Sequence, residues 1–377
     1  MVTITVIGWY GTETIGDRAI FSGLLRVFSG VFNDYCIQLG ALYVHFTERT
    51  LLEDYEFYQD ISDRKVKRIE IFDSLNAHAL RTNIRRSDLL VVGGGPLMDL
   101  TCMFMLEFSL RYAHRHHVKS CLLGCGWGPL KEQMYIRSAL QDINYSDLII
   151  FRDSTSLHSA VENGASKKMH ALIDPAFFAA QYYAHKHSQN EESDYIAVNF
   201  RDVTIDGTYE AKGMNVKSLT GIVMQLLDAF PKQDVRLIPM HTFYVGGDDR
   251  IILEQVKNSL HSSKVSVQHI PLSLENTMGM YRNASICLGM RFHSIVLQSV
   301  LNGKNYILDY TDSRKGKIRG MLEQLNLTSQ LEGRYIHLSQ SNKLNFSWGN
   351  IKKFVIDDGI ISTYFNSYVQ LIEQIVR

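Results

Sequence analysis

An arginine and a histidine lie two residues apart in the stretch CLGMRFHSIVLQ, residues 287–298. Arg291 carries a permanent forked cation, which suits phosphate or carboxylate groups. His293 is of the side-chain type that most readily exchanges a proton near neutral pH. The pair therefore predicts proton chemistry on an anion. The alternative is that Arg291 makes a structural ion pair and that His293 caps a helix.

A short strand and a helix must position this pair. Residues 285–288 form an apolar run, and Gly289 lets the backbone turn after it. The next residues place apolar side chains at helical spacing until Asn302 and Gly303 stop the pattern. Because a helix start offers free N–H groups, this switch from strand to helix favours an anion as well.

The first half of the chain repeats one design, in which an apolar strand ends in glycines or charged side chains. The four examples are Val2–Ile7 before the loop Gly8–Asp17, Leu89–Val92 before Gly93–Gly95, Ser120–Leu123 before Gly124–Pro129, and Leu148–Phe151 before Arg152–Ser154. Parallel strands end at one edge of a sheet, so the repetition predicts one ligand crevice. Plain turns remain the alternative for each loop. The first loop is neither GxGxxG nor a P-loop, and no nucleotide assignment follows.

The second half restarts the same alternation of strands and helices. The strand Tyr195–Phe200 leads to Arg201, Val235–Met240 leads to His241, and Tyr306–Tyr310 leads to a basic stretch with Arg314, Lys315, Lys317 and Arg319. Helices are predicted over residues 216–230 and 249–260. The basic stretch is either a solvated loop or an anion-facing element one strand beyond Arg291.

At 377 residues the chain is too long for one ordinary core and suits two domains. We predict an α/β fold of two Rossmann-like domains, residues 1–180 and 195–345, that face each other across a cleft. The polar residues 181–194, with His185 and His187, are interpreted as a solvated linker. Residues 350–377 contain an amphipathic helix whose apolar face would suit packing against the domain junction.

Composition narrows the class of protein. The formal net charge of zero argues against nucleic acid as a partner and against a membrane-steered surface. No segment has the length of a membrane span, and Met1 leads directly into a strand, so we expect a cytoplasmic protein. The five cysteines are odd in number and lie in apolar runs, which favours reduced thiols. Cys121 and Cys125 lack a second pair, so no metal site is expected.

Taken in order, these residues resemble the polysaccharide pyruvyl transferase family over roughly residues 3–325. The resemblance rests on Gly8–Gly11 with Gly16 and Asp17, Gly93–Gly95 with Asp99, Gly126–Pro129, Arg152–Ser154, Asp174 with Pro175, and Arg291–His293 with Tyr310 and Lys317. It implies a glycosyltransferase-B-like architecture. It also implies transfer of the pyruvyl group of phosphoenolpyruvate to a sugar in a cell-surface or exopolysaccharide precursor, which gives a ketal.

The resemblance also implies roles for single residues. His293 would be the general acid/base, with Asp17 and Asp153 as further candidate bases. Arg201 and Arg291 would clamp the donor, joined by Lys317. The acceptor would lie against the glycine loops of the first domain, at Gly11, Gly94 and Gly95, with Trp127 or Trp9 stacking on a sugar ring.

Two departures from the family pattern concern Arg18, which stands where the family often has glutamate, and Lys317, which follows Tyr310 by a longer spacer than usual. Phosphoenolpyruvate would be a co-substrate, and no cofactor or metal is expected because arginines can neutralise the leaving phosphate. The acceptor would be a lipid-linked or oligosaccharide sugar, which is compatible with peripheral association with membrane assembly machinery. Two other functions stay open: a glycosyltransferase with a nucleotide-sugar donor, and a non-catalytic sugar- or anion-binding subunit of an assembly complex.

Overall fold

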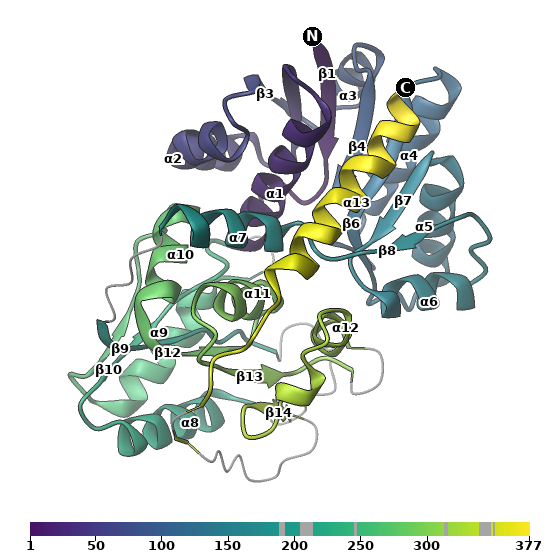
Figure 1. Ribbon diagram of the computed structural model, residues 1–377. Helices are drawn as coiled ribbons and strands as arrows, with labels where there is room; N and C mark the ends of the chain where they lie inside the picture. The colour runs from purple at the N-terminus through teal and green to yellow at the C-terminus, as the bar shows by residue number, and fades with distance from the viewer. Residues whose placement is uncertain (188–192, 204–213, 245–246, 313–315, 339–347, 350) are drawn as a thin grey trace. The chain divides into compact units, whose positions relative to one another are not determined.

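The computed structural model describes residues 1–187, 193–203, 214–244, 247–312, 316–338, 348–349 and 351–377 (Figure 1). The chain divides into two compact units, which we call unit 1 and unit 2. Unit 1 comprises Met1–Glu13, Asp17–Ala179 and Asp358–Arg377, and unit 2 comprises Thr14–Gly16 and Ala180–Asp357. Each unit contains a parallel sheet, so the α/β class predicted from the sequence is confirmed.

The sheet of unit 1 has the strand order β3-β2-β1-β4-β6-β7-β8. The strands are β1 Val2–Ile7, β2 Tyr35–Ala41, β3 Val66–Asp73, β4 Leu89–Gly93, β6 Lys119–Trp127, β7 Leu148–Phe151 and β8 His170–Ala171, and the short β5 Pro96–Leu97 pairs with β6. β1, β4 and β7 are buried or partly buried along their length, as strands of a parallel sheet covered on both faces should be. The order reverses between β1 and β4, so the carboxyl ends of these strands mark a topological switch point.

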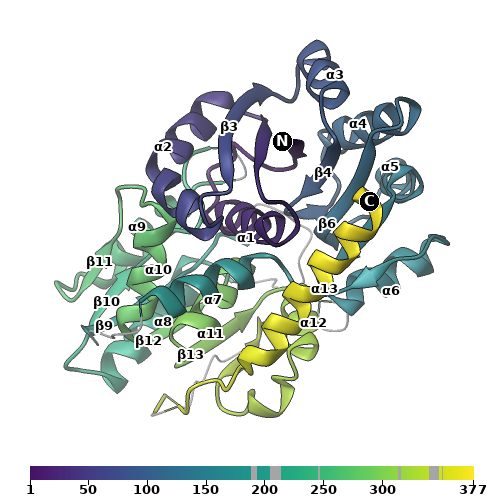
Figure 2. The same cartoon turned by 45° about the horizontal axis from the view of Figure 1, so that its top comes forward.

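Helices cover both faces of this sheet. They are α1 Ile15–Val31, α2 Val44–Ile61, α3 Ala77–Arg85, α4 Met103–Arg115, α5 Gln133–Tyr145, α6 Ser154–Glu162 and α13 Asp358–Val376. The helix α7 Ala176–Lys186 begins in unit 1 and belongs to unit 2 from Ala180. α1 and α13 lie on one face, and α4 and α5 on the other (Figure 2). The C-terminal helix packs within unit 1, where the Tyr368 hydroxyl donates to the Ile173 carbonyl at 2.8 Å. Its predicted role at the domain junction stays a prediction.

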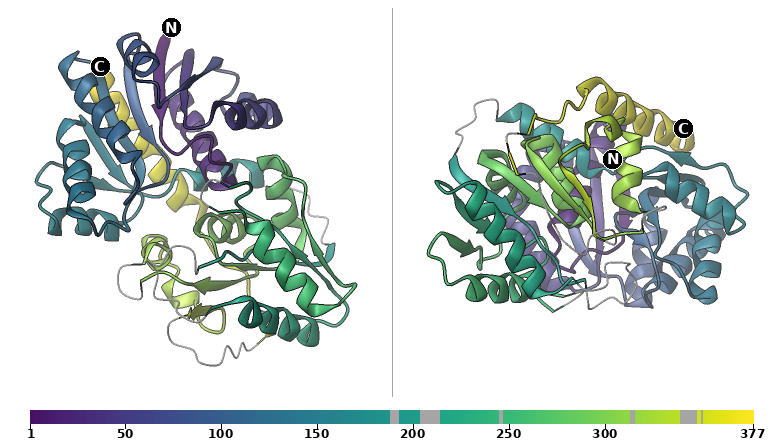
Figure 3. Two further views of the ribbon diagram at one scale, coloured as in Figure 1. Left: turned by 180° about the vertical axis from the view of Figure 1, so that it is seen from behind. Right: turned by 90° about the horizontal axis from the view of Figure 1, so that it is seen from below.

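The sheet of unit 2, which Figure 3 shows from behind and from below, has the strand order β11-β10-β9-β12-β13-β14. The strands are β9 Ser193–Val198, β10 Asp234–Leu237, β11 Val265–Val267, β12 Ala284–Gly289, β13 Asn305–Asp309 and β14 Tyr335–His337. The helices are α8 Val216–Ala229, α9 Asp249–Leu260, α10 Leu274–Asn283, α11 Phe292–Leu301 and α12 Lys317–Gln324. Every neighbouring pair is parallel, and the order reverses between β9 and β12. The second switch point therefore lies where Arg201 and Arg291 follow their strands.

The strand and helix predicted around Arg291 are confirmed. β12 ends at Gly289, α11 begins at Phe292 and Asn302 is its C-cap. Two other predictions are wrong. The linker expected over residues 181–194 is helical up to Lys186 as the end of α7 and strand from Ser193 in β9, while residues 188–192 lie outside the described residues. The loop expected from Gly124 is strand as far as Trp127, because a shift of register lets β6 continue beside β7 past this glycine.

Three further observations concern the described part of the chain. No helix in it is both long enough and apolar enough to cross a bilayer. The same residues contain no cluster of three or more His, Cys, Asp or Glu side chains that could bind a metal ion. The five cysteines, all within these ranges, form no disulfide.

Candidate active site

Tyr310 lies among basic side chains at the carboxyl ends of β9 and β13. The Nη1 of Arg201 donates to the Tyr310 hydroxyl oxygen at 3.2 Å, and the guanidinium carbon lies 5.1 Å from the centre of the ring. The Nζ of Lys317 lies 5.7 Å from the same ring centre. Because β9, β12 and β13 are parallel neighbours, residues far apart in the sequence meet at this edge.

The cations change the acidity of Tyr310. Its side chain is 1% exposed, and burial by itself raises the pKa of a phenol. Lys317, Arg201 and Arg291 outweigh that effect and lower the pKa of Tyr310 to about 8. By contrast, burial keeps the pKa of Tyr306, on the strand β13 that ends just before Tyr310, above its ordinary value. The surroundings of Tyr310 are therefore strongly electropositive, which is the property that an anion site needs.

Arg291 is held in place by Asp249, the first residue of α9. The Nε and Nη2 atoms of Arg291 donate to the Asp249 carboxylate at 2.8 and 2.6 Å. The same carboxylate accepts from the backbone N–H groups of Met240 and His241, and Asp249 is only 2% exposed. Such a forked, buried pair fixes the direction of the guanidinium. The structural ion pair of Arg291, which was the alternative in the sequence analysis, therefore exists. Arg291 nevertheless helps to lower the pKa of Tyr310.

His293 is the second residue of α11, and its ring lies against the backbone of Gly16. A methyl group added at Gly16 would come within 2.1 Å of the Nδ1 of His293. The preceding residue, Ile15, is bonded to unit 2, because its backbone N–H donates to the Met240 carbonyl at 3.0 Å. The N-cap of α11 is Arg291, so the alternative that His293 caps this helix is wrong.

The candidate bases Asp17 and Asp153 belong to unit 1. Asp153 is the N-cap of α6, and its carboxylate accepts from the Ser156 N–H at 2.6 Å. Burial raises the pKa of Asp153, against the opposing effect of Arg152. Asp17 lies in the first turn of α1 and accepts from the Thr12 hydroxyl at 3.3 Å. The cap gives Asp153 a structural role, whereas Asp17 lies directly after the glycine that contacts His293.

The predicted glycines of unit 1 are packed against the protein itself. Gly11, Gly94 and Gly95 all have positive φ, which favours glycine. A methyl group at Gly11 would meet the backbone of Tyr43 at 2.7 Å, and one at Gly95 would meet the Trp9 indole at 1.7 Å. Tight turns and close packing therefore explain these glycines.

The two tryptophans considered for sugar stacking differ in exposure. The Trp9 indole is 7% exposed and donates from Nε1 to the Pro96 carbonyl at 3.0 Å. Trp127 ends β6, is partly exposed and packs edge-on against Phe151. Of this pair, Trp127 retains surface for a ligand.

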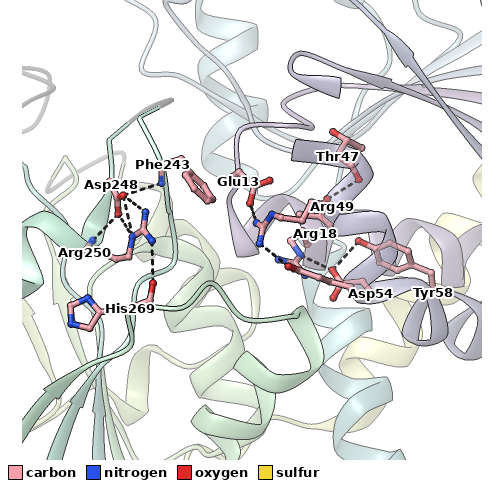
Figure 4. Close-up of polar contacts among 12 residues, drawn as sticks. Glu13, Arg18, Thr47, Arg49, Asp54, Tyr58, Phe243, Asp248, Arg250 and His269 are labelled. Carbon is pink, nitrogen blue, oxygen red and sulfur yellow. Dashed lines mark hydrogen bonds and ion pairs between the residues drawn. The ribbon is translucent and has the colours of Figure 1, made fainter. Parts of the chain in front are cut away.

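Arg18, the departure from the family pattern, is neutralised within unit 1. Its Nε pairs with Asp54 and its Nη2 with Glu53, both on α2. Arg49 extends the network by pairing with Glu53 and Glu13, as the close-up in Figure 4 shows for Arg18, Arg49, Asp54 and Glu13. The cation that replaces the usual glutamate is thus balanced by local acids.

The residues of the predicted site are divided between the two units. In unit 2 the structure brings together Arg201, Arg291 and Lys317, with His293 on the helix that Arg291 caps. Asp17, Asp153, Gly11, Gly94, Gly95 and Trp127 lie in unit 1, at or beyond the ends of β1, β4, β6 and β7. Arg314 and Lys315 lie outside the described residues.

Sequence reasoning gave no role to Tyr310 or Asp249. Tyr310 carried a weak signal, since it ends an apolar strand and precedes a basic stretch. Asp249 was recognised only as a helix start.

Several solved structures have a similar fold. The UDP-GlcNAc 2-epimerase of Methanocaldococcus jannaschii, in complex with UDP-GlcNAc and UDP, aligns with a TM-score of 0.58 at 11% identity, covering 99% of this chain and 100% of that one. The UDP-GlcNAc 2-epimerase of Neisseria meningitidis bound to UDP-GlcNAc aligns with a TM-score of 0.53 at 13% identity, covering 100% and 94%. At these identities the likeness shows the fold alone, which is glycosyltransferase-B-like.

The family follows from the sequence match. Residues 15–310 match the sequence model of the polysaccharide pyruvyl transferases, and the chain belongs to this family. No curated protein matches it. Family membership supports a transferase that acts in polysaccharide biosynthesis.

Proposed function

We propose that the protein transfers the pyruvyl group of phosphoenolpyruvate to hydroxyls of a sugar in a cell-surface or exopolysaccharide precursor, forming a pyruvate ketal. Family membership supports the reaction class. The observation that carries the proposal is the electropositive cluster at Tyr310, built from three cations that act on one buried ring. Such a cluster suits a small donor with both a carboxylate and a phosphate.

Donor binding would use the cations in different ways. Arg201 carries a planar guanidinium that fits a carboxylate or phosphate, whereas Arg291, whose Nε and Nη2 are bound to Asp249, would act through its remaining N–H groups and its charge. Lys317 adds a more compact charge beside Tyr310. Because Asp249 fixes the direction of Arg291, this cation needs little reorganisation when charge develops on the leaving phosphate.

His293 would begin the chemistry by donating a proton to the methylene carbon of the donor. The resulting cationic centre at C2 is attacked by one sugar hydroxyl, whose proton passes to a base. The C–O bond to phosphate then breaks, phosphate leaves with its electron pair, and a second hydroxyl closes the ketal with loss of its proton. His293 in its deprotonated form, Asp17 and Asp153 are candidate bases. The cap role of Asp153 favours the first two.

The acceptor would lie on the side of unit 1, where Trp127 offers a partly exposed ring for stacking on a sugar. Because phosphoenolpyruvate is a cytoplasmic metabolite, the proposed reaction belongs in the cytoplasm. A lipid-linked acceptor would bring the protein to the inner face of the membrane, beside the assembly machinery.

The test is an incubation of the purified protein with a sugar acceptor and either phosphoenolpyruvate or a nucleotide sugar. We expect release of inorganic phosphate with phosphoenolpyruvate, and an acceptor that gains a ketal by mass spectrometry. The matched control is the His293→Gln variant, which keeps a polar side chain at this position but cannot donate the proton. Release of nucleoside diphosphate in place of phosphate would contradict the proposal.

A nucleotide-sugar glycosyltransferase is the second candidate function. It draws support from the similar fold of epimerases whose structures contain UDP-GlcNAc. The same cations of unit 2 would then hold a diphosphate. The incubation separates the two candidates, and a protein that consumes neither donor would favour a binding subunit.

A further inference from the structure

One face of unit 1 is rich in arginine. The helices α3, α4 and α5 pack side by side there, and their buried residues join one apolar core with β4, β6 and β7. Their cations are Arg81, Arg85, Arg111, Arg115 and Arg137, and their acids are Glu107 and Asp142. Asp142 is buried, and Glu107 lies 3.9 Å from the guanidinium of Arg111. The other four arginines are exposed and form no ion pair with any residue that the structure describes. We call the outward side of these three helices the basic face.

The opposite face of unit 1 has the opposite balance of charge. Its helix α1 contacts α2 through Phe21 with Tyr58, and it contacts α13 through Arg26 with Phe365. The acids of these three helices outnumber their cations. The acids are Asp17, Glu48, Glu53, Asp54, Glu56, Asp60, Asp358 and Glu373, and the cations are Arg18, Arg26 and Arg49. The zero net charge of the whole chain therefore conceals two faces of unlike sign.

Aromatic rings lie beneath two of the exposed arginines. The guanidinium carbon of Arg81 lies 5.3 Å from the centre of the Phe108 ring, and that of Arg85 lies 5.6 Å from the centre of the Tyr112 ring. These two rings, one turn apart on α4, stack with their centres 6.0 Å apart. A guanidinium that lies over a ring covers apolar surface with its stem and keeps its charge for an anion. Such pairs suit a surface with anionic groups above an apolar layer.

The basic face also carries exposed apolar side chains, at the starts of α4 and α5. Leu100, Phe104 and Met134 are 43%, 39% and 53% exposed, and we call them the apolar ridge. The Phe104 ring stacks on Tyr135 with the ring centres 5.4 Å apart. The Asp99 carboxylate accepts from two backbone N–H groups just before α5, so the two helix starts are held together. Apolar side chains exposed at one place on a surface indicate contact with another apolar body.

We propose that the basic face docks on a membrane surface that contains anionic lipids. The arginines lie at the headgroup phosphates of the docked protein, and the apolar ridge inserts at the boundary between headgroups and acyl chains. Cations near an anionic leaflet and apolar side chains at this depth strengthen binding together. The inference rests on the proposed function only where it concerns a lipid-linked acceptor.

The apolar ridge distinguishes a membrane from a soluble polyanion. Leu100 and Met134 have no ring on which a nucleic-acid base could stack, and a nucleic acid would leave them in water. A bilayer supplies both an anionic surface and an apolar layer beneath it. The combination of cations and aliphatic side chains on one face therefore favours the membrane.

The apolar ridge lies at the edge of the sheet where the proposed acceptor would bind. α4 follows β4 and α5 follows β6, so their first turns lie near the carboxyl ends of these strands. Trp127 is the last residue of β6 and pairs with Leu97, three positions before Leu100. Docking through the ridge would hold Trp127 near the bilayer, where the sugar of a lipid-linked acceptor lies.

The test is flotation of the full-length protein with lipid vesicles, without donor or acceptor. Vesicles of phosphatidylcholine alone are compared with vesicles that also contain phosphatidylglycerol, at low and at high salt. One variant of the basic face, Arg85→Gln/Arg115→Gln, removes two exposed cations. A second, Leu100→Ser/Met134→Ser, removes two apolar side chains of the ridge.

Matched controls change similar side chains elsewhere in unit 1. Arg68→Gln/Arg377→Gln removes two arginines whose side chains are 64% and 78% exposed. Leu52→Ser removes an apolar side chain that is 82% exposed on α2. Because every substituted side chain is exposed, the thermal unfolding midpoint of each variant should stay close to that of the wild type.

We expect the wild type and the controls to float with anionic vesicles and to bind weakly to phosphatidylcholine. Arg85→Gln/Arg115→Gln should weaken partitioning at low salt, by roughly fivefold for each cation removed. This difference should shrink at high salt, because salt screens exposed charges. Leu100→Ser/Met134→Ser should weaken partitioning roughly tenfold at either salt concentration, because burial of apolar area is not screened.

Absence of partitioning onto anionic vesicles would overturn the inference, and so would controls that weaken it as much as the variants of the basic face. Partitioning that the ridge variant leaves unchanged and that an oligonucleotide abolishes would also overturn it, in favour of a soluble polyanion. The result is separate from the proposed function. If the protein docks but forms no ketal from phosphoenolpyruvate, the proposed function fails and the inference stands. If a ketal forms on a soluble sugar and the protein does not dock, the inference alone fails.

Discussion

Unit 1 and unit 2 share a design of parallel strand, loop and helix, yet they hold their cations differently. In unit 1, Arg18 pairs with Asp54 and Arg152 lies 3.5 Å from Asp174, so acids of the same unit balance these charges. In unit 2, Arg291 likewise pairs with the acid Asp249, yet it acts together with Arg201 and Lys317 to lower the pKa of Tyr310. The topology of each sheet decides where the loops meet. In unit 2, three cations act on one buried ring where the loops meet, which favours an anion there.

The strongest way to test this contrast is His293→Ala. The variant should lose about 10²–10⁴-fold in turnover with phosphoenolpyruvate, since general acid catalysis typically contributes that much. Because His293 is partly exposed, the thermal unfolding midpoint should change little. Phosphate release and acceptor mass measure the effect, and near-normal turnover would remove His293 from the mechanism.

Asp249→Ala tests whether the direction of Arg291 matters. Removing one partner of a buried ion pair should lower the free energy of unfolding by about 3–5 kcal/mol and weaken donor binding. Asp248→Ala is the control, because Asp248 caps the same helix and its partner Arg250 is more exposed (Figure 4). Loss of this cap should cost about 1 kcal/mol. Equal effects in chemical denaturation would contradict the special role of Asp249.

Gly16→Ala tests whether the position of the His293 ring matters, and it changes no charge. The added methyl group would come within 2.1 Å of Nδ1, so the ring must move. We expect a loss of roughly tenfold or more in turnover, as misplacing a catalytic group does, with phosphate affinity nearly unchanged. Gly221→Ala on α8 is the control, because nothing lies within 4 Å of its added methyl group. This control should stabilise the helix by about 1 kcal/mol.

Trp127→Ala should have the smallest effect. It tests whether unit 1 binds the acceptor while unit 2 binds the donor. If its ring stacks on the acceptor, the KM for the sugar should rise roughly fivefold, because an aromatic contact contributes about 1 kcal/mol. The KM for phosphoenolpyruvate should stay constant. A rise in the donor KM alone would argue that unit 1 does not receive the acceptor.

Local sequence pattern predicted much of the fold. Alternation of apolar runs with helical periodicity identified β1, β4, β7, β9, β10, β12 and β13. It also placed the start of α9 at Asp249 and the turn before α11 near Arg291. It failed at the end of α7, where polar side chains on a helix resemble a linker. It also failed at β6, where a register shift lets the strand continue past Gly124.

The sequence by itself determined the residue types of the candidate site, because a permanent cation and a titratable ring are properties of Arg291 and His293. The tertiary structure decided their surroundings. Asp249 reaches Arg291 across 42 positions, and Arg201 reaches Tyr310 across 109. Such contacts form only when parallel strands bring their ends together. The cations that lower the pKa of Tyr310 against the effect of its burial likewise come from three separate segments of the chain.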